Sequence, residues 1–289
     1  MKRNEYRSGK NALDVRNPVL RTFNYIVICM AVIAVFTPIF ILIINSFKGD
    51  KEYMYSGVFQ LPESFLNFDN FKYFITHGKL FLGFRNTFFL IFVSTTVSVL
   101  LGTMVAFAAG RFDFKFKRLI MAAFMLAISI PTVTTQVATF SLIKGLGLYN
   151  TIFSCMLLYL GTNVIQIYIF LQFIGTIPVE LDESAKIDGA RYFRIFFSII
   201  LPLMKPAIAA TTILKVIEIY NDMFTPYLYM PDPELRTVTT ALMMFNAEKN
   251  SSWNVMAAGI LLIMIPTVLI YLFSQKYIIS GVGAGAVKG

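Results

Sequence analysis

Apolar and polar residues alternate along this chain in long blocks, and the apolar blocks have the length of membrane spans. A helix needs about 20 predominantly apolar residues to cross a bilayer. Six runs approach or exceed that length, at about 23–44, 86–109, 119–143, 152–174, 207–229 and 255–273. The pattern therefore predicts an all-α membrane protein with six transmembrane helices within residues 22–280.

The third and fourth runs carry polar residues at membrane depth. The third contains Pro131, followed by a threonine-rich segment that ends at Gln136. This segment predicts a kinked helix, which either lines a cavity or has its kink satisfied by hydroxyl groups against neighbouring helices. The fourth run contains Asn163, Gln166 and Gln172.

Composition and charge agree with a membrane location. Only 14% of the 289 residues are charged, against about 25% in soluble domains. The net charge of +9 comes from basic residues beside the apolar runs, as in residues 1–21 and 111–118. By the positive-inside rule these segments and both termini are expected on the cytoplasmic side, and no nucleic-acid partner is expected. Cys29 and Cys155 stand alone within apolar runs, so neither a disulfide framework nor a metal site is predicted.

A charged segment, residues 178–206, separates the fourth and fifth runs. Acidic residues at Glu180, Asp182 and Glu183 suit the first turn of a helix, where the helix dipole is positive. Gly189 allows a sharp turn, and the apolar residues after it predict a second helix. We therefore expect a helix-turn-helix unit that lies across one mouth of the membrane domain.

The same segment carries a family resemblance. Glu183-Ser184-Ala185, then Gly189, then Leu201-Pro202 resembles the EAA motif of bacterial ABC importer permeases, with Ser184 where the family usually has alanine. The fuller string around Asp188-Gly189-Ala190 resembles the carbohydrate branch of that family. The closing Gly-Ala-Val-Lys-Gly is similar to the end of maltose-permease-like chains, which predicts a complete C-terminus.

The resemblance implies a fold, a function and a set of partners. It implies the type I ABC importer permease fold, with residues 1–21 as a cytoplasmic tail, 178–206 as the coupling loop and 281–289 as a cytoplasmic glycine-rich tail. The implied function is that of a permease subunit that imports a sugar or oligosaccharide through the bacterial cytoplasmic membrane. The implied partners are a second homologous permease, two ABC ATPase subunits and an extracellular or periplasmic sugar-binding protein. The residues implied to couple to the ATPase are Glu183, Ala185, Asp188, Gly189, Ala190, Leu201 and Pro202.

The sequence contains no GxxxxGK[S/T] phosphate-binding loop, which the ATPase subunit of such a transporter would need. It also offers no arrangement of a nucleophile and a base. We therefore expect a transport subunit rather than an enzyme, with no cofactor of its own and with ATP bound by partner subunits.

The fifth run has the most polar cluster at membrane depth. At ~100° per residue, Lys215, Glu218 and Asp222 fall on one helical face, and the first two can pair. Charges in a membrane are expected to face the bundle interior or a water-filled cavity. Tyr220-Asn221-Asp222 resembles the aromatic-Asn-acid segment of sugar permeases, which usually have tryptophan in place of Tyr220. The candidate substrate path is therefore Glu218, Tyr220, Asn221 and Asp222, and the alternative is a buried ion pair that holds this helix to a neighbour.

Two other functions fit parts of the sequence. An ion-coupled secondary transporter would use Glu218 and Asp222 as proton carriers, but it would need no coupling loop. An ABC permease for another substrate, such as an amino acid or a phosphonate, would keep the loop. The sequence does not name the sugar.

Overall fold

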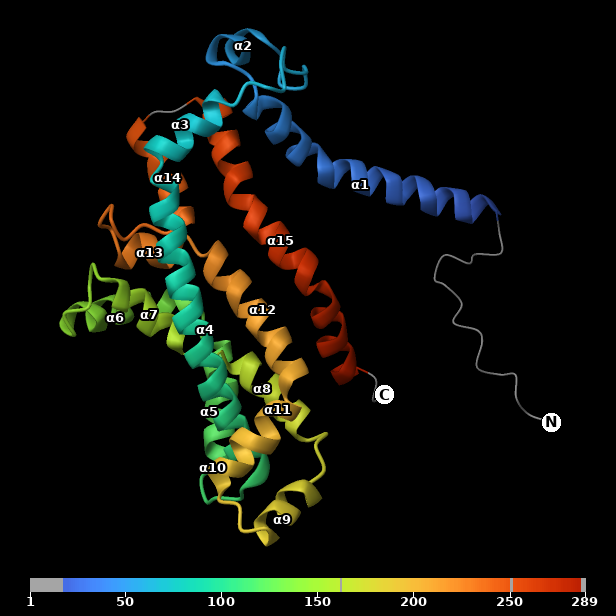
Figure 1. Ribbon diagram of the computed structural model, residues 1–289, viewed down its shortest axis with the longest axis vertical. Coiled ribbons are helices and arrows are strands. Elements are labelled where there is room, and N and C mark those ends of the chain that lie inside the picture. Colours follow the sequence, from blue (N-terminus) through green and yellow to red (C-terminus); the bar gives the residue numbers. More distant parts are fainter. Residues whose placement is uncertain (1–17, 162, 250–251, 287–289) are drawn as a thin grey trace. The chain divides into compact units, whose positions relative to one another are not determined.

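The computed structural model describes residues 18–161, 163–249 and 252–286, and these residues form helices joined by turns and loops (Figure 1). The chain divides into two compact units. The first comprises residues 1–73 with 252–261, and the second comprises residues 74–251 with 262–289.

The first unit contains α1 (Pro18–Ser46), α2 (Asp50–Tyr55), the start of α3 (Asp69–His77) and the start of α15 (Trp253–Ala286). Buried asparagines tie these elements together. The Asn70 side chain donates to the carbonyl oxygens of Ser46 and Lys48, both at 2.8 Å. The Asn254 side chain donates to the Lys48 carbonyl and to Oδ1 of Asp50, both at 2.9 Å. These bonds satisfy backbone carbonyl groups at the end of α1 and just beyond it. Such groups have no partner within the helix, so a buried helix end needs partners from elsewhere.

The second unit is built around α4 (Leu80–Arg111), and it holds the elements that carry the expected functional residues. In chain order these are α5 (Lys117–Ser129), α6 (Thr132–Gly145), α7 (Ile152–Leu160), α8 (Val164–Ile174), α9 (Glu180–Ile187), α10 (Tyr192–Ile195), the π-helix η1 (Phe196–Ile200), α11 (Leu201–Leu203), α12 (Lys205–Asn221), α13 (Phe224–Tyr229) and α14 (Val238–Lys249). The helix α4 packs against α7, α8, α12 and α14.

Small residues let the neighbours approach α4 closely. Ser94, Ser98, Gly102 and Ala106 recur every fourth position and are buried, so they form one stripe along the helix. Small stripes of this kind allow close packing between membrane helices. Gly110 continues the stripe, and a Cβ atom there would lie 2.9 Å from Cγ2 of Ile174 on α8. The small-residue spacing of the second apolar run therefore has a packing role in the structure.

The predicted six spans agree with the helices by length and composition. Four segments are long and apolar enough to cross a membrane: Pro18–Ser46, Leu80–Arg111, Ile152–Ile174 and Trp253–Phe273. Two bent pairs bring the number to six if each counts as one span: Lys117–Ser129 with Val133–Gly145, and Tyr192–Leu203 with Lys205–Asn221. The predicted all-α membrane fold is confirmed for the described residues.

The clearest differences from the sequence-based boundaries lie in three places. The third run is two helices at 107° with Ile130 and Pro131 between them, rather than one kinked helix. The fifth helix ends at Asn221 instead of residue 229, because Asp222 has an extended backbone with ψ of 117°. At the C-terminus α15 continues to Ala286, so most of the expected tail of residues 281–289 is helical, and residues 287–289 lie outside the described part.

Candidate functional site

The expected helix-turn-helix forms at residues 178–206, and we call α9 to α11 with their connecting turn the coupling unit. Gly189 has a φ of +80°, the left-handed region that favours glycine. The Ala190 N–H donates to the Ala185 carbonyl at 2.9 Å, and the Gly189 N–H donates to the Lys186 carbonyl at 3.0 Å. These two bonds form a Schellman motif, which ends α9 and satisfies its last carbonyl groups. The predicted turn at Gly189 is confirmed.

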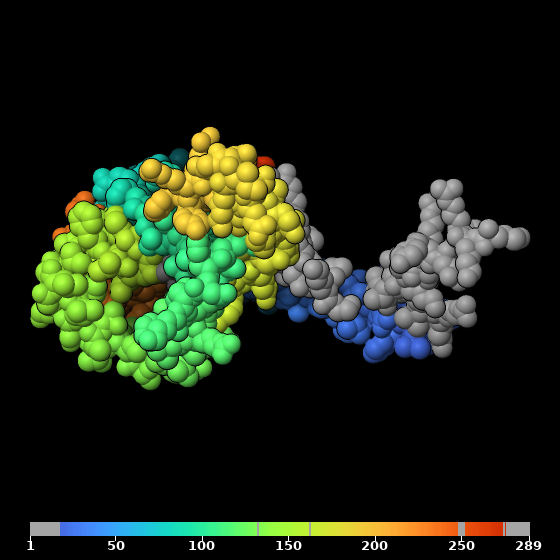
Figure 2. Space-filling model, turned by 90° about the horizontal axis from the view of Figure 1, so that it is seen from below, coloured from blue at the N-terminus to red at the C-terminus, as the bar shows by residue number. Residues whose placement is uncertain are grey.

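The expected coupling residues divide between two faces of the unit. Glu183, Asp188 and Gly189 are exposed, whereas Ala185 is buried. Ala190 and Leu201 are half-buried against the core, and Pro202 is exposed. Figure 2 views the end of the second unit at which α9 and α10 form the surface, in yellow and gold. The exposed acidic face is therefore available to another chain, while Ala185 sets how closely α9 approaches its own neighbours.

A buried ion pair joins the coupling unit to the end of α4. Nε of Arg111 lies 2.7 Å from Oδ2 of Asp182, and the two side chains are only 8% and 6% exposed. Nη2 of Arg111 also donates to the Ile177 carbonyl at 2.8 Å. Because removing one partner of a buried pair leaves an uncompensated charge, this contact fixes the position of α9 against α4. No local pattern in the sequence indicates this pair, because the two residues are distant in the chain.

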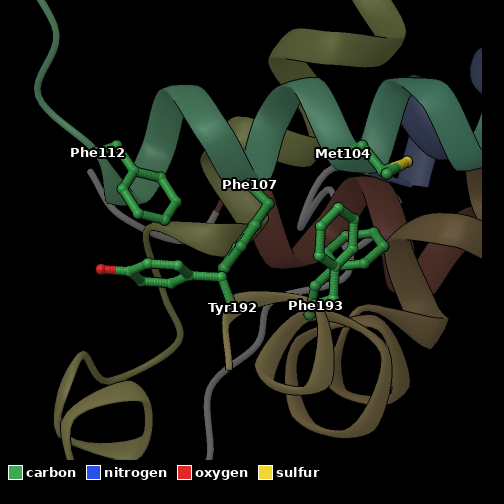
Figure 3. Close-up of a pocket in the computed structure, with 6 residues that line it drawn as sticks. Met104, Phe107, Phe112, Tyr192 and Phe193 are labelled. Carbon is green, nitrogen blue, oxygen red and sulfur yellow. The ribbon is translucent and has the colours of Figure 1, made fainter. Parts of the chain in front are cut away.

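An aromatic groove lies beside this ion pair, between the end of α4 and α10. It has a volume of about 170 Å³ and is lined by Met104, Phe107, Phe112, Tyr192, Phe193 and Phe196. Figure 3 shows the side chains of α4 and α10 facing one another, with the Tyr192 hydroxyl pointing away from the other rings. The Phe112 and Tyr192 rings meet edge to face at 5.0 Å between centroids.

A polar pocket lies between α8 and α12. Its α12 side is Thr211, Leu214, Lys215 and Glu218, which share one helical face, and its α8 side is Asn163, Ile165, Gln166 and Ile169. The volume is about 160 Å³. Nζ of Lys215 lies 3.6 Å from Oε2 of Glu218, as the spacing predicted, but the first side chain is 6% exposed and the second 52%.

Gln166 lines this pocket and carries a buried, unsatisfied donor. Its Oε1 accepts from the Ser98 hydroxyl at 3.5 Å, but its buried Nε2 has no partner within the described part of the chain. The backbone is extended at Gly161 and Asn163, between α7 and α8. Non-helical backbone at membrane depth occurs where it is buried in protein or lines a cavity. Polar side chains from α8 and α12 therefore line one small cavity beside the break between α7 and α8.

The structure separates the four residues expected to line the substrate path. Glu218 lines the polar pocket. Tyr220 is buried, and its hydroxyl donates to the Ile263 carbonyl on α15 at 2.7 Å. Asn221 is exposed and donates to the Ile217 carbonyl at 3.0 Å. Asp222 accepts from the Tyr159 hydroxyl at 2.9 Å and from the Thr225 N–H at 3.0 Å. Tyr220 and Asp222 thus hold the end of α12, and a transport role for these residues stays a prediction.

Comparison with known proteins decides the family. The family described as "binding-protein-dependent transport system inner membrane component" matches residues 98–283. The chain belongs to this family. It is therefore a multi-pass membrane protein and a component of a transport system, as predicted, rather than an enzyme.

Individual relatives and solved structures agree with this assignment. The chain is 31% identical to the melibiose/raffinose/stachyose import permease protein MelC of Bacillus subtilis (strain 168), over 88% of this chain and 92% of that protein. It is 27% identical to the maltodextrin transport system permease protein MalD of Streptococcus pneumoniae, over 96% and 99% of the two chains. A bacterial ABC transporter involved in alginate import has a similar fold, with a TM-score of 0.82, 19% identity and 90% and 96% coverage. The predicted ABC importer permease fold is confirmed.

Proposed function

We propose that this chain is a permease subunit of an ATP-driven importer of a sugar or short oligosaccharide in the bacterial cytoplasmic membrane. The names of its relatives support the substrate class, since MelC and MalD are named for oligosaccharide transport. The observation that carries the proposal is the coupling unit. Its Schellman turn presents Glu183 and Asp188 on an exposed face, and its buried face is tied to the spans through Asp182.

In this proposal the exposed face of α9 contacts one of two ABC ATPase subunits. The ATP is bound and hydrolysed by those partners, and this chain needs no cofactor. A second homologous permease completes the membrane channel, and an extracellular or periplasmic binding protein delivers the sugar. Both termini and the coupling unit face the cytoplasm, because the basic residues flanking the spans favour that side.

The polar pocket between α8 and α12 is the part of the proposed substrate path that the contacts support best. Lys215 is ten residues beyond the start of α12, which corresponds to about 15 Å along the helix axis. That is half of a hydrocarbon core of about 30 Å. A sugar hydroxyl can accept from the Lys215 ammonium, and it can donate to the Glu218 carboxylate. A volume of about 160 Å³ is below the roughly 300–1,000 Å³ of pockets for whole drug-sized ligands, so it suits one ring of a longer substrate.

The alternative structural role for this face has less support. Lys215 and Glu218 belong to the same helix, so their contact does not join α12 to a neighbour. Their distance is 3.6 Å and Glu218 is half exposed, and such pairs contribute at most about 1 kcal/mol. A pair of that kind does little for assembly, whereas Tyr220 and Asp222 make the contacts that hold this end of α12.

ATP-driven uptake by the reconstituted complex tests the proposal. Gly189→Val forces a β-branched residue into a left-handed backbone, with strain on the order of 1–3 kcal/mol. We expect this variant to insert into the membrane but to lose ATP-driven uptake of the sugar and co-purification of the ATPase. Gly145→Val is the control, because a Cβ atom at Gly145 meets open space and its φ lies outside the left-handed region.

The same assay separates the proposal from ion-coupled transport. Uptake that requires ATP and the binding protein supports it. Uptake driven by a proton gradient without ATP, or full uptake by Gly189→Val, would refute it.

A further inference from the structure

The aromatic groove between α4 and α10 leaves a large apolar surface uncovered. Phe193 is 70% exposed, and Phe116 and Phe197 are also exposed nearby in the sequence. Exposed aromatic residues in a cluster mark a surface that binds another apolar molecule. Met104 and Phe107 extend the groove along α4, so the part of an occupant that lies inside the groove must be apolar.

The length of α4 places this groove at a membrane surface. Its 32 residues extend about 48 Å, which exceeds a hydrocarbon core of about 30 Å and even the roughly 40–45 Å that includes the headgroups. The groove lies between Met104 and Phe112, over the last two turns of α4. It therefore passes from the edge of the acyl region through the headgroup layer.

Cations surround the headgroup end of the groove. Nζ of Lys186 lies 5.3 Å from the centroid of the Tyr192 ring, and Nζ of Lys117 donates to the Phe112 carbonyl at 3.2 Å. Arg191 and Arg194 flank the groove residues Tyr192 and Phe193 in the sequence and are exposed.

Acids offset only part of this charge. Lys117 pairs with the exposed Asp113 at 3.1 Å, and Asp182 is paired with Arg111. Glu183 is exposed on the neighbouring helix α9. Within the described residues Arg191 and Arg194 have no acidic partner. Their charges are therefore available to an anionic group beside the groove residues Tyr192 and Phe193.

We propose that this groove binds an anionic phospholipid, with one acyl chain along Phe107, Phe193 and Phe196 and the phosphate between Arg191 and Arg194. Basic pockets beside membrane helices bind anionic headgroups through this combination of charge and apolar surface. A bound lipid would fill the space between α4 and α10 at the point where Arg111 and Asp182 attach α9. It would thus support the position of the coupling unit from the membrane side.

Lipid titration of the purified, delipidated complex tests this proposal, with bound lipid counted by native mass spectrometry. The probes are phosphatidylglycerol and the zwitterionic phosphatidylcholine. We expect one site with at least tenfold preference for phosphatidylglycerol. Arg191→Gln with Arg194→Gln should lower the phosphatidylglycerol affinity by roughly 10- to 30-fold, since each cation near an anionic surface contributes about 1 kcal/mol. The affinity for phosphatidylcholine should stay unchanged.

Further variants make the test specific to the groove. Phe193→Ser should lower the affinity for both lipids by a similar factor, because it removes contact with the acyl chain but removes no charge. Arg85→Gln with Lys144→Gln removes the same charge from exposed positions at the first turns of α4 and at the end of α6, and it should leave the preference intact. Arg191→Lys with Arg194→Lys keeps both charges, so it should keep the preference for phosphatidylglycerol that the double glutamine variant loses.

Any one of three results would overturn the proposal. The first is an unchanged phosphatidylglycerol preference in the double glutamine variant, and the second is an unchanged lipid affinity in Phe193→Ser. The third is loss of the ATPase subunit from these variants while lipid binding persists, which would make the groove a protein-binding surface.

Discussion

Removing Asp182 should uncouple ATP hydrolysis from transport, because it releases α9 from α4. Both side chains of the Arg111–Asp182 pair are more than nine-tenths buried and lie 2.7 Å apart. Truncating one partner of such a pair costs about 3–5 kcal/mol. Arg111 would keep its bond to the Ile177 carbonyl, so we expect the lower end, about 3 kcal/mol. At 1.4 kcal/mol per factor of ten, the population with α9 detached rises roughly a hundredfold.

The assay measures two quantities for each variant: the melting temperature of the complex, and the number of ATP molecules hydrolysed per sugar imported. Asp182→Ala and Arg111→Ala should both lower the melting temperature and raise the ATP cost of each imported sugar. Asp113→Asn is the matched control, because the Asp113 carboxylate that pairs with Lys117 is fully exposed. This substitution should change neither quantity.

A double substitution tests the physical reasoning behind this prediction. Replacing a buried ion pair by apolar side chains of similar size is often neutral or stabilising. Arg111→Met with Asp182→Leu should therefore recover much of the stability and coupling that each single variant loses. Wild-type behaviour of Asp182→Ala, or a double variant as impaired as the single ones, would refute the idea that the pair acts as an attachment.

The remaining predictions concern α12. Lys215→Met should lower sugar uptake several-fold while the complex still assembles, because it removes a donor from the polar pocket without breaking a contact between helices; loss of assembly instead would favour a structural role. Tyr220→Phe should lower the melting temperature by removing the hydrogen bond to Ile263, a loss of about 1 kcal/mol, with little change in the apparent KM for the sugar. A large change in KM without loss of stability would return Tyr220 to the substrate path.

Local signals predicted most of the fold. The apolar runs fixed where the spans lie, because burial in a bilayer needs a minimum length. The turn at Gly189 was predictable from this residue alone, because glycine favours the left-handed backbone that Gly189 adopts. The contact between Lys215 and Glu218 was also predictable, because it depends only on helical spacing.

Features that depend on distant packing could not be predicted from the sequence. Pro131 indicated a bend, but the 107° angle between α5 and α6 is set by contacts that spacing does not encode. Arg111 and Asp182 each had a sufficient local explanation, one as a positive-inside residue and the other as an acid near a helix start, so nothing indicated their pairing. Tyr220 looked like a ring for sugar binding because of its neighbours in the sequence, whereas its burial against α15 appears only in the fold.

Site-specific cross-linking tests the central claim most directly, that the exposed face of α9 is the contact with the ATPase. A photoreactive amino acid is placed at Ile187, which is 87% exposed at the end of α9. The control position is Leu146, which is 56% exposed beyond the end of α6. In membranes that contain the complete transporter, we expect a cross-link from position 187 to the ATPase subunit and no cross-link from position 146. A transporter that imports sugar with ATP but gives no cross-link from position 187, or gives one from position 146, would contradict it.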